Sequence, residues 1–238
     1  MLHTLPRLER IAHRGAPREF PENSLEGFLR ALERGADAVE LDVHKTRDGG
    51  VVIHHDPDLR TPDGALLPIS GLSQEEVERC GLAAGLRIPS LAQVLEAVGA
   101  RATVYIELKG HDVGAAAAAV AHAHGTHFAL HSFDHDAIRA LSASLPQLSY
   151  GILLDAGTPD PAAVAGAFGG RDIWAHWTLA DAALARRIHA RGQRLLAWTV
   201  NDPAEADRLR VAGVDGVCTD DVRLLGSWAA LDTGQPPA

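Results

Sequence analysis

The sequence predicts a (β/α)8 TIM barrel, and three observations lead to this fold class. Short apolar runs alternate with helix-like segments along the 238 residues, which is the pattern of parallel βα units. Eight of the runs suit parallel strands, the number that closes a barrel. A ninth run follows its predecessor too closely for a parallel crossover, so it must return antiparallel as an extra hairpin strand after the second barrel strand. An open doubly wound sheet is the alternative, but its usual Gly-rich phosphate turn is absent.

The strands are expected where short apolar runs occur, and the helices where apolar residues recur every three to four positions. The eight parallel strands are expected at 9–13, 38–43, 103–108, 128–132, 149–154, 172–177, 194–200 and 215–219. Helical patterns between them include 24–35, 90–100, 134–144, 179–192 and 203–213. The turn-rich segment 59–88 is expected to elaborate the barrel mouth. We therefore expect one domain over 1–231 and a flexible tail at 232–238.

Composition excludes several function classes. Hydrophobic residues make up 46% of the chain, enough for a packed core. The formal charge of −9 argues against a general nucleic-acid or anionic-membrane binder, although a local basic pocket remains compatible with it. No run reaches the length of a membrane span or suits a signal peptide. Cys80 and Cys218 give no disulfide framework, so a cytoplasmic protein is expected.

The ninth apolar run ends near two histidines, and its register depends on the turn before it. A two-residue turn at 48–49 would place His55 opposite Asp42. A turn at 49–50 would instead place His55 opposite His44. Because a slip of two positions preserves the face, both registers predict that His55 lies on the face of the preceding strand that carries its carboxylates.

Carboxylates interrupt two of the expected strands. Glu40 and Asp42 alternate with apolar residues in AVELDV, and Glu107 does so in TVYIEL, which places them on the inward face of the barrel. Polar groups at the carboxyl ends of barrel strands are typical of an active site. Three carboxylates without thiolates suit one divalent metal ion, Mg²⁺ or Ca²⁺. A plain ion-pair network with Arg14 and Lys109 is the alternative.

Further polar residues follow the expected strands. His13 and Arg14 end the first strand, where an imidazole suits acid–base chemistry and a guanidinium suits a phosphate. With His55, they place two histidines at one rim, so one can accept a proton while the other donates one. Trp198 suits either an apolar ligand wall or barrel packing. His131 lies near a strand end and can line a pocket.

Two polar pairs have a simpler interpretation as helix caps. Asn23 or Ser24 precedes the helical pattern SLEGFLRALERG and is of a residue type that caps helix amino termini. Thr219 and Asp220 follow the last strand and can cap the segment after it. We therefore expect a capping role for these residues.

Together these segments resemble the glycerophosphodiester phosphodiesterase family, of the phosphatidylinositol phospholipase C-like superfamily. The resemblance is colinear over about residues 11–222 and rests on the order and spacing of several motifs. They are AHRG at 12–15, FPENSLEGF at 20–28, GADAVELDVHKTRDGGVVIHHDPDL at 35–59, IPSL at 88–91, IELK at 106–109, HSF at 131–133, WTVN at 198–201 and GVDGVCTD at 213–220.

The resemblance implies a (β/α)8 barrel enzyme of lipid and glycerol metabolism, and it implies a role for most of the residues above. His13 and His55 correspond to the acid–base pair. Glu40, Asp42 and Glu107 correspond to the ligands of the divalent metal. The cations that would contact the phosphate are Arg14 and Lys109.

The expected reaction is metal-dependent hydrolysis of a small-molecule glycerophosphodiester to sn-glycerol 3-phosphate and an alcohol. Family analogy suggests attack by the glycerol 2-hydroxyl and a cyclic phosphate that water then opens. A lysophospholipase D-type activity is the alternative, favoured if Leu66, Leu67, Ile69 and Leu72 form an exposed apolar rim. A non-catalytic barrel that binds a phosphorylated ligand is the alternative from another class.

Overall fold

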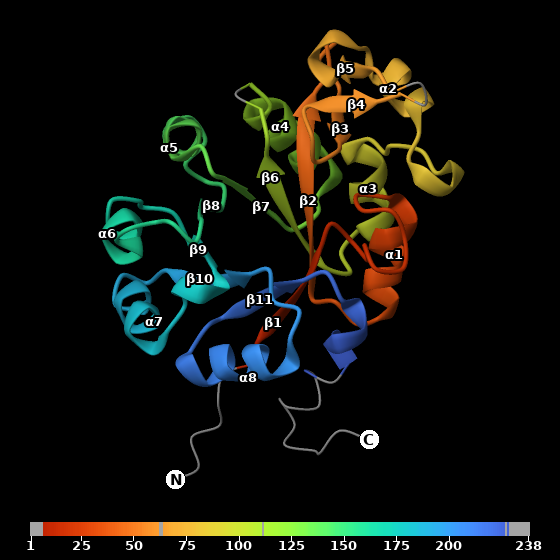
Figure 1. Ribbon diagram of the computed structural model, residues 1–238. Helices are drawn as coiled ribbons and strands as arrows, with labels where there is room; N and C mark the ends of the chain where they lie inside the picture. The colour runs from red at the N-terminus through yellow and green to blue at the C-terminus, as the bar shows by residue number, and fades with distance from the viewer. Residues whose placement is uncertain (1–6, 62–63, 111, 227, 229–238) are drawn as a thin grey trace.

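Eight parallel strands form a closed ring (Figure 1). The computed structural model describes residues 7–61, 64–110, 112–226 and 228. The order of the strands in the ring is β1-β11-β10-β9-β8-β7-β6-β2, and pairing of β1 with β2 closes it. The expected (β/α)8 barrel is confirmed. The barrel strands are β1 (Glu9–His13), β2 (Ala38–Lys45), β6 (Thr103–Leu108), β7 (Phe128–Ser132), β8 (Tyr150–Leu154), β9 (Asp172–His176), β10 (Arg194–Trp198) and β11 (Gly216–Thr219).

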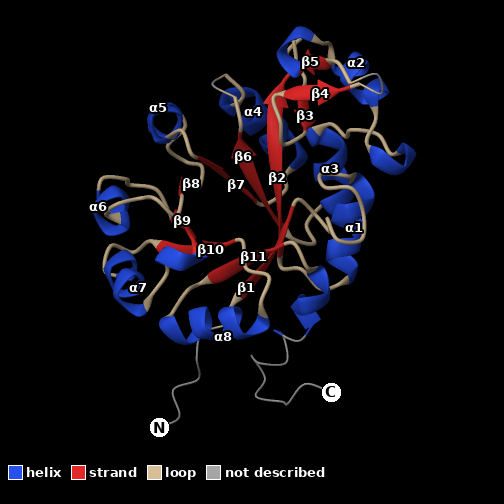
Figure 2. Ribbon diagram, in the orientation of Figure 1, coloured by secondary structure: helices blue, strands red, loops and turns tan. Residues whose placement is uncertain are grey.

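Helices cover the outside of the ring (Figure 2). Most begin at a serine or aspartate whose side chain accepts a hydrogen bond from the first turn, which satisfies donors that a helix start leaves unpaired. Among the described residues, none of the helices is both long and apolar enough to cross a bilayer. The helices around the ring are α1 (Leu25–Glu33), α3 (Leu91–Val98), α4 (Gly114–His124), α5 (His135–Ser144), α6 (Pro161–Gly166), α7 (Ala182–His189) and α8 (Pro203–Ala212), with short 3-10 turns at Trp177–Leu179 and Val222–Leu224.

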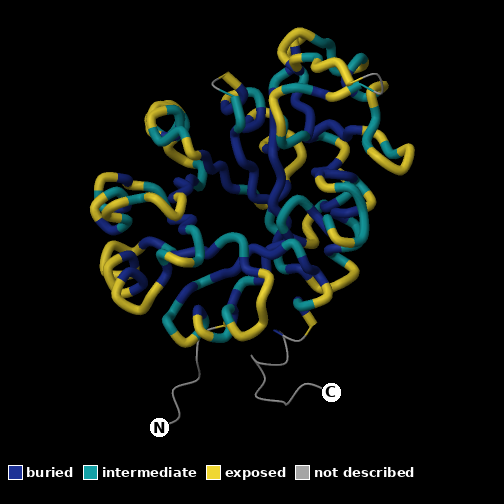
Figure 3. Tube along the Cα trace, viewed as in Figure 1, coloured by how far each residue is buried: buried dark blue, intermediate teal, exposed yellow. Residues whose placement is uncertain are grey.

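Strand alternation divides the apolar residues into two cores. Outward residues such as Leu41 and Ile106 pack against the helices in a large buried cluster. Inward residues such as Tyr105 and Trp174 fill the barrel in a smaller cluster. In Figure 3 the buried residues accordingly follow the strands, and exposed residues gather on the helices and loops. The strand that carries Glu40 is therefore packed on its outer face by the helix-facing core and on its inner face by the barrel core, which holds the inward side chains in place.

The extra strand, β3 (Val51–Ile53), pairs antiparallel with β2 as expected, but both predicted registers are wrong. Val43 lies opposite Ile53, and three residues form the loop instead of two. Gly49 adopts a φ of +87°, so a three-residue loop closed by a left-handed glycine is formed. The observed register would turn His55 outward if the strand continued. The strand β3 ends at Ile53, however, so this register does not extend to His55. The chain beyond β3 brings His55 to the barrel mouth.

The segment after β3 builds a small layer of its own. It contains the hairpin β4 (Asp58–Arg60) and β5 (Leu66–Pro68), the helix α2 (Gln74–Cys80) and 3-10 turns at Ile69–Gly71 and Ala83–Gly85. Ile69 is buried in a small apolar cluster, and Leu72 packs against this cluster. These two residues therefore form a core instead of the exposed rim considered above. Leu66 is exposed. The tail predicted at 232–238 lies outside the described residues.

Candidate active site

Strand register assembles the polar residues at the carboxyl end of the barrel. His13 on β1 lies level with Glu40 on β2. Asp42, one inward position further along β2, lies level with Glu107 on β6, which in turn lies level with His131 on β7. Inward side chains at matched positions of parallel neighbours are adjacent. The ring therefore brings residues far apart in the sequence into two adjacent rows.

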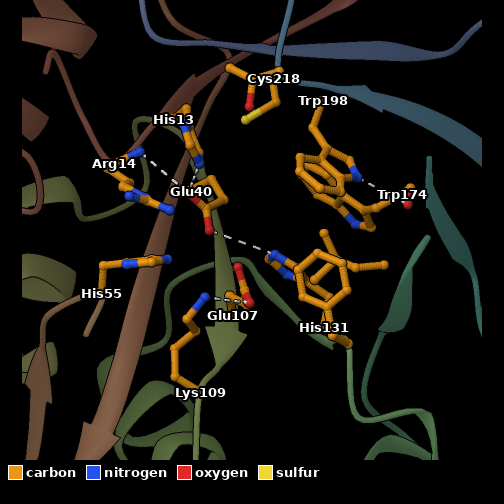
Figure 4. Close-up of a pocket in the computed structure, with 13 residues that line it drawn as sticks. His13, Arg14, Glu40, His55, Glu107, Lys109, His131, Trp174, Trp198 and Cys218 are labelled. Carbon is orange, nitrogen blue, oxygen red and sulfur yellow. Dashed lines mark hydrogen bonds and ion pairs between the residues drawn. The ribbon is translucent and has the colours of Figure 1, made fainter. Parts of the chain in front are cut away.

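These side chains, with the exception of Asp42, line a cavity of about 270 Å³ at the mouth of the barrel. Figure 4 shows His13, Arg14 and His55 on one side of it and the aromatic residues on the other, with the carboxylates between them. Such a size suits one compact polar ligand. The lining residues are His13, Arg14, Glu40, His55, Glu107, Lys109, His131, Phe133, Leu153, Trp174, Trp198, Thr199 and Cys218.

The loop between β1 and α1 is tightly constrained where it meets the cavity. Arg14 and Asn23 both adopt positive φ, at 51° and 58°, a conformation that non-glycine residues rarely adopt away from functional sites. Gly15, at φ +86°, lies so close to the α1 backbone that a Cβ would meet the carbonyl carbon of Gly27 at 2.8 Å. The backbone nitrogen of Asn23 donates to the Arg14 carbonyl and ties the two ends of the loop together.

Asp42 is fully buried and surrounded by donors. Asn23 Nδ2 donates to Asp42 Oδ2 over 2.9 Å, and Arg14 Nε lies 3.0 Å from the same oxygen. Lys109 Nζ lies 3.5 Å from Asp42 Oδ1. Burial by itself would raise the pKa of Asp42, but the two cations and the Asn23 hydrogen bond lower it below its ordinary value. Asp42 is therefore an anion at neutral pH.

Glu40 and Glu107 are less well compensated. Glu40 is only 3% exposed, and its Oε1 has no hydrogen-bond partner among the described residues. Burial and the carboxylates of Asp42 and Glu40 raise the pKa of Glu107 to about 7. The ion-pair alternative thus accounts for Asp42 but leaves Glu40 incompletely paired. The nearby side-chain cations therefore do not fully neutralise this buried cluster of carboxylates.

The donor set fits a divalent cation. Glu40, Glu107 and His131 each offer a ligand atom, and these atoms lie within 4.8 Å of one another. Two carboxylates and an imidazole are ordinary ligands for a divalent ion. The orphaned Glu40 Oε1 and Asp42 Oδ1 also lack hydrogen-bond donors, as expected of oxygens that face a cation.

Two side-chain cations face the same cavity. Lys109 Nζ lies 2.9 Å from Glu107 Oε1, and Arg14 reaches Glu22 Oε2 at 3.0 Å as well as Asp42. Burial lowers the pKa of Lys109, but Glu107 and Asp42 more than offset this and raise it. Both side chains therefore stay charged and can hold an anion such as a phosphoryl group.

Each of the two predicted catalytic histidines has an aspartate at Nδ1. His13 Nδ1 lies 2.6 Å from Asp220 Oδ1, and His55 Nδ1 lies 2.7 Å from Asp56 Oδ1. Burial lowers the pKa of His13, but the hydrogen bond to Asp220 and the charge of Glu40 outweigh it and raise the pKa. Nε2 of His13 lies 3.8 Å from Glu40 Oε2. An imidazole held in this way can accept a proton or donate one.

Aromatic residues form the opposite wall of the cavity. Trp174 stacks on His131 with ring centroids 4.7 Å apart. Trp198 meets Phe133 and His176 edge to face, at 5.5 Å in each case, and its Nε1 donates to the Trp174 carbonyl. Trp198 therefore combines the two interpretations offered from sequence, since it is held by barrel packing and also lines the cavity.

The structure brings the predicted site residues together around one mouth, and it adds two that sequence reasoning missed, Asn23 and Asp220. Ser24, not Asn23, caps α1, and Asn23 instead holds Asp42. Asp220 contacts His13, and its neighbour Asp221 caps the turn that follows. His131 was identified only as a potential pocket residue, and it lies among the carboxylates. Strand register is the signal that places it there.

Known proteins match this chain over nearly its whole length. A profile of the Glycerophosphoryl diester phosphodiesterase family matches residues 13–224. A glycerophosphodiester phosphodiesterase of Caldanaerobacter subterraneus subsp. tengcongensis is 31% identical over 231 residues, covering 90% of this chain and 95% of that protein.

Solved structures agree. The glycerophosphodiester phosphodiesterase of Thermotoga maritima superimposes with a TM-score of 0.80 at 27% identity, covering 93% of this chain and 98% of that one. A phosphodiesterase of Oleispira antarctica, solved with the product sn-glycerol-3-phosphate, has a TM-score of 0.82 at 28% identity and covers 94% of this chain and 97% of its own.

Proposed function

The chain belongs to the glycerophosphoryl diester phosphodiesterase family, and on that premise we propose that it hydrolyses glycerophosphodiesters to sn-glycerol 3-phosphate and an alcohol with a divalent cation and two histidines. The observation that carries this proposal is the meeting of His13, His55, Arg14 and Lys109 around buried carboxylates in one cavity. The relative that holds sn-glycerol-3-phosphate supports the same product.

Glu40, Asp42 and Glu107 are proposed to hold the cation, Mg²⁺ or Ca²⁺, and His131 lies within reach of the same position. When bound there, a divalent cation would supply positive charge beside the phosphoryl group and would lower the pKa of the attacking hydroxyl. Arg14 and Lys109 hold the remaining phosphoryl oxygens. Asn23 keeps Asp42 oriented through two hydrogen bonds: its side-chain nitrogen donates to Asp42 Oδ2, and its side-chain oxygen accepts from the Asp42 backbone nitrogen.

The two histidines move the protons. One takes the proton of the attacking hydroxyl at Nε2, and the other gives a proton from Nε2 to the leaving alcohol oxygen as the P–O bond breaks. Both rings have Nδ1 turned toward an aspartate, so Nε2 is the nitrogen available to the substrate. Opening of a cyclic phosphate by water would use the same groups with their roles exchanged.

The aromatic wall is proposed to receive the alcohol. Trp198 and Phe133 present ring faces and edges beside the cavity, and Phe133 is 44% exposed. Such surfaces attract a quaternary ammonium group as well as apolar chains. Glycerophosphocholine is therefore the first substrate to examine. A lysophospholipid has less support, because the expected apolar rim at Ile69 and Leu72 is packed into a core.

Phosphorus NMR of the products tests the proposal. Incubation with glycerophosphocholine should yield sn-glycerol 3-phosphate and free choline. The variants His13→Ala and His55→Ala should each lower kcat by about 10²–10⁴-fold. His124→Ala is the matched control, since His124 lies exposed at the end of α4 and should keep full activity. Phosphocholine as the product, or full turnover in His13→Ala, would refute the proposal.

A further inference from the structure

His13 is held from behind by a carboxylate that the proposed reaction does not use. Asp220 Oδ1 lies 2.6 Å from His13 Nδ1, on the far side of the ring from Glu40. We infer that Asp220 is a positioning residue for His13. Its carboxylate accepts a hydrogen bond from the protonated Nδ1 of His13, which leaves Nε2 free for the substrate. This inference rests on the proposed function, in which His13 Nε2 exchanges a proton with the reacting oxygen.

Asn201 locks the orientation of Asp220. The side-chain oxygen of Asn201 accepts from Thr219 Oγ1 over 3.0 Å and from the Asp220 backbone nitrogen over 2.9 Å. Because the Asp220 backbone nitrogen can only donate, the amide cannot flip without losing that bond and placing two donors against each other. Its nitrogen must then point to Asp220 Oδ2, to which it donates over 2.8 Å. One oxygen of Asp220 is thereby committed to Asn201 and the other to His13.

Barrel closure supplies all three partners. His13 ends β1, Asn201 follows β10 and Asp220 follows β11, and β11 lies between the other two strands in the ring. The capping role that the sequence suggested for Asp220 belongs to its neighbour, since Asp221 accepts from the Arg223 backbone nitrogen. Asp220 therefore has no local structural task among these contacts, and its side chain serves the histidine.

The partner of His55 is held differently. Asp56 is the next residue in the sequence, and its side chain is 69% exposed, compared with 32% for Asp220. The contact of His55 with Asp56 is thus a local one at the surface, whereas that of His13 is fixed by a third residue. His13 is the histidine whose tautomer the fold determines.

The lock predicts a particular result for Asp220→Asn. Asn201 Nδ2 still points at position 220, so the new amide must turn its oxygen toward Asn201 and its nitrogen toward His13. That nitrogen donates to Nδ1, which forces the proton of a neutral imidazole onto Nε2. His13 then presents the wrong atom to the substrate, and kcat should fall by about 10²–10⁴-fold with little change in KM.

Nitrogen NMR of the histidine rings provides a readout that does not need turnover. The pH is raised until the ring signals of His13 no longer change, so that the imidazole is neutral. The wild-type His13 signal should then show the proton on Nδ1, and Asp220→Asn should shift it to Nε2. The signal is assigned by its loss in His13→Ala. Asp221→Asn is the matched control, since it makes the same change one residue away and should keep both the tautomer and the turnover.

The outcomes separate this inference from the proposed function. An unchanged His13 tautomer in Asp220→Asn, or a kcat within about threefold of wild type, would overturn the positioning role. If Asp220→Asn does not fold, Asn201→Ala replaces it, because it keeps the carboxylate but removes its lock, and it should lower kcat by about tenfold. A wild-type enzyme that is inactive on glycerophosphodiesters but has the expected tautomer would overturn only the proposed function.

Discussion

The two ends of the barrel use the same kinds of residue with different results. At the amino-terminal end, Tyr105 donates to Glu9, and Arg194 pairs with both Glu9 and Asp172. Asp172 is fully buried and accepts further hydrogen bonds from Arg171 over 2.6 to 3.0 Å. Every charge in this network has an opposite partner. Such an arrangement closes the barrel and stabilises it.

The carboxyl-terminal end has charged residues in excess of their partners. Glu40 Oε1 and Asp42 Oδ1 are buried without hydrogen bonds from the described residues, and Glu107 has a raised pKa. Complete pairing of the charges at one end and an excess of carboxylates over cations at the other indicate that the second end is built to bind something else. Four predictions test this contrast.

Glu40→Gln should have the largest effect. It keeps the shape of the side chain and removes the charge, so the site loses an anionic ligand. We expect kcat to fall by about 10³-fold or more, because a metal ion contributes several kcal/mol to charge stabilisation. The free energy of unfolding of the metal-free variant should be no lower than that of metal-free wild type, since a poorly paired buried charge is removed. A kcat within tenfold of wild type would contradict the assignment.

Asp172→Asn makes the corresponding change at the other end. We expect the free energy of unfolding to fall by roughly 3 kcal/mol, toward the low end of the range for a broken buried ion pair because the arginine partners are partly exposed. The kcat of the folded protein should not change. Urea unfolding and steady-state kinetics measure the two quantities. Loss of turnover without loss of stability would show that the two ends do not differ as described.

The pKa of Glu107 gives a pH dependence of stability. In the folded, metal-free protein this pKa is raised to about 7, above the ordinary value of 4.5. The protonated group therefore favours the folded state below pH 4.5, and this contribution is lost as the pH rises through 7. Urea unfolding in chelator should show wild type losing stability relative to Glu107→Gln across that interval. Parallel curves for the two proteins would contradict the raised pKa.

Phe133→Ala should have the smallest effect. The exposed ring borders the cavity beside Trp198 and is proposed to contact the alcohol. Removing it should raise KM for glycerophosphocholine about two- to fivefold, the size of an exposed cation–π contact. KM for glycerophosphoglycerol, whose alcohol is uncharged, should change less. Equal changes for the two substrates would remove the aromatic wall from the choline contact.

Sequence reasoning succeeded where the signal was strictly local and periodic. Alternation in AVELDV and TVYIEL placed Glu40, Asp42 and Glu107 inward, and the outward residues between them do pack on the helices. The count of parallel strands was also correct. These features depend on side-chain direction along a strand, which a period of two determines.

The failures have a different origin. The residues RDGG allow loops of two or three residues, so the hairpin register was not determined by the turn residues alone. Asn23 and Asp220 are residue types that cap helices, and each stands next to the residue that does so. Their real partners, Asp42 and His13, are distant in the sequence. Contacts set by barrel closure leave no local pattern to read.

The central claim is that the incompletely paired carboxylates at the carboxyl-terminal end of the barrel form a metal-dependent catalytic centre. Metal dependence of turnover tests this claim most directly. Protein freed of metal by chelation should not hydrolyse glycerophosphocholine. Titration with Mg²⁺ or Ca²⁺ should restore turnover and saturate at one bound cation per chain, while Glu40→Gln stays inactive throughout. Full turnover by protein whose metal content has been measured as zero would contradict the account.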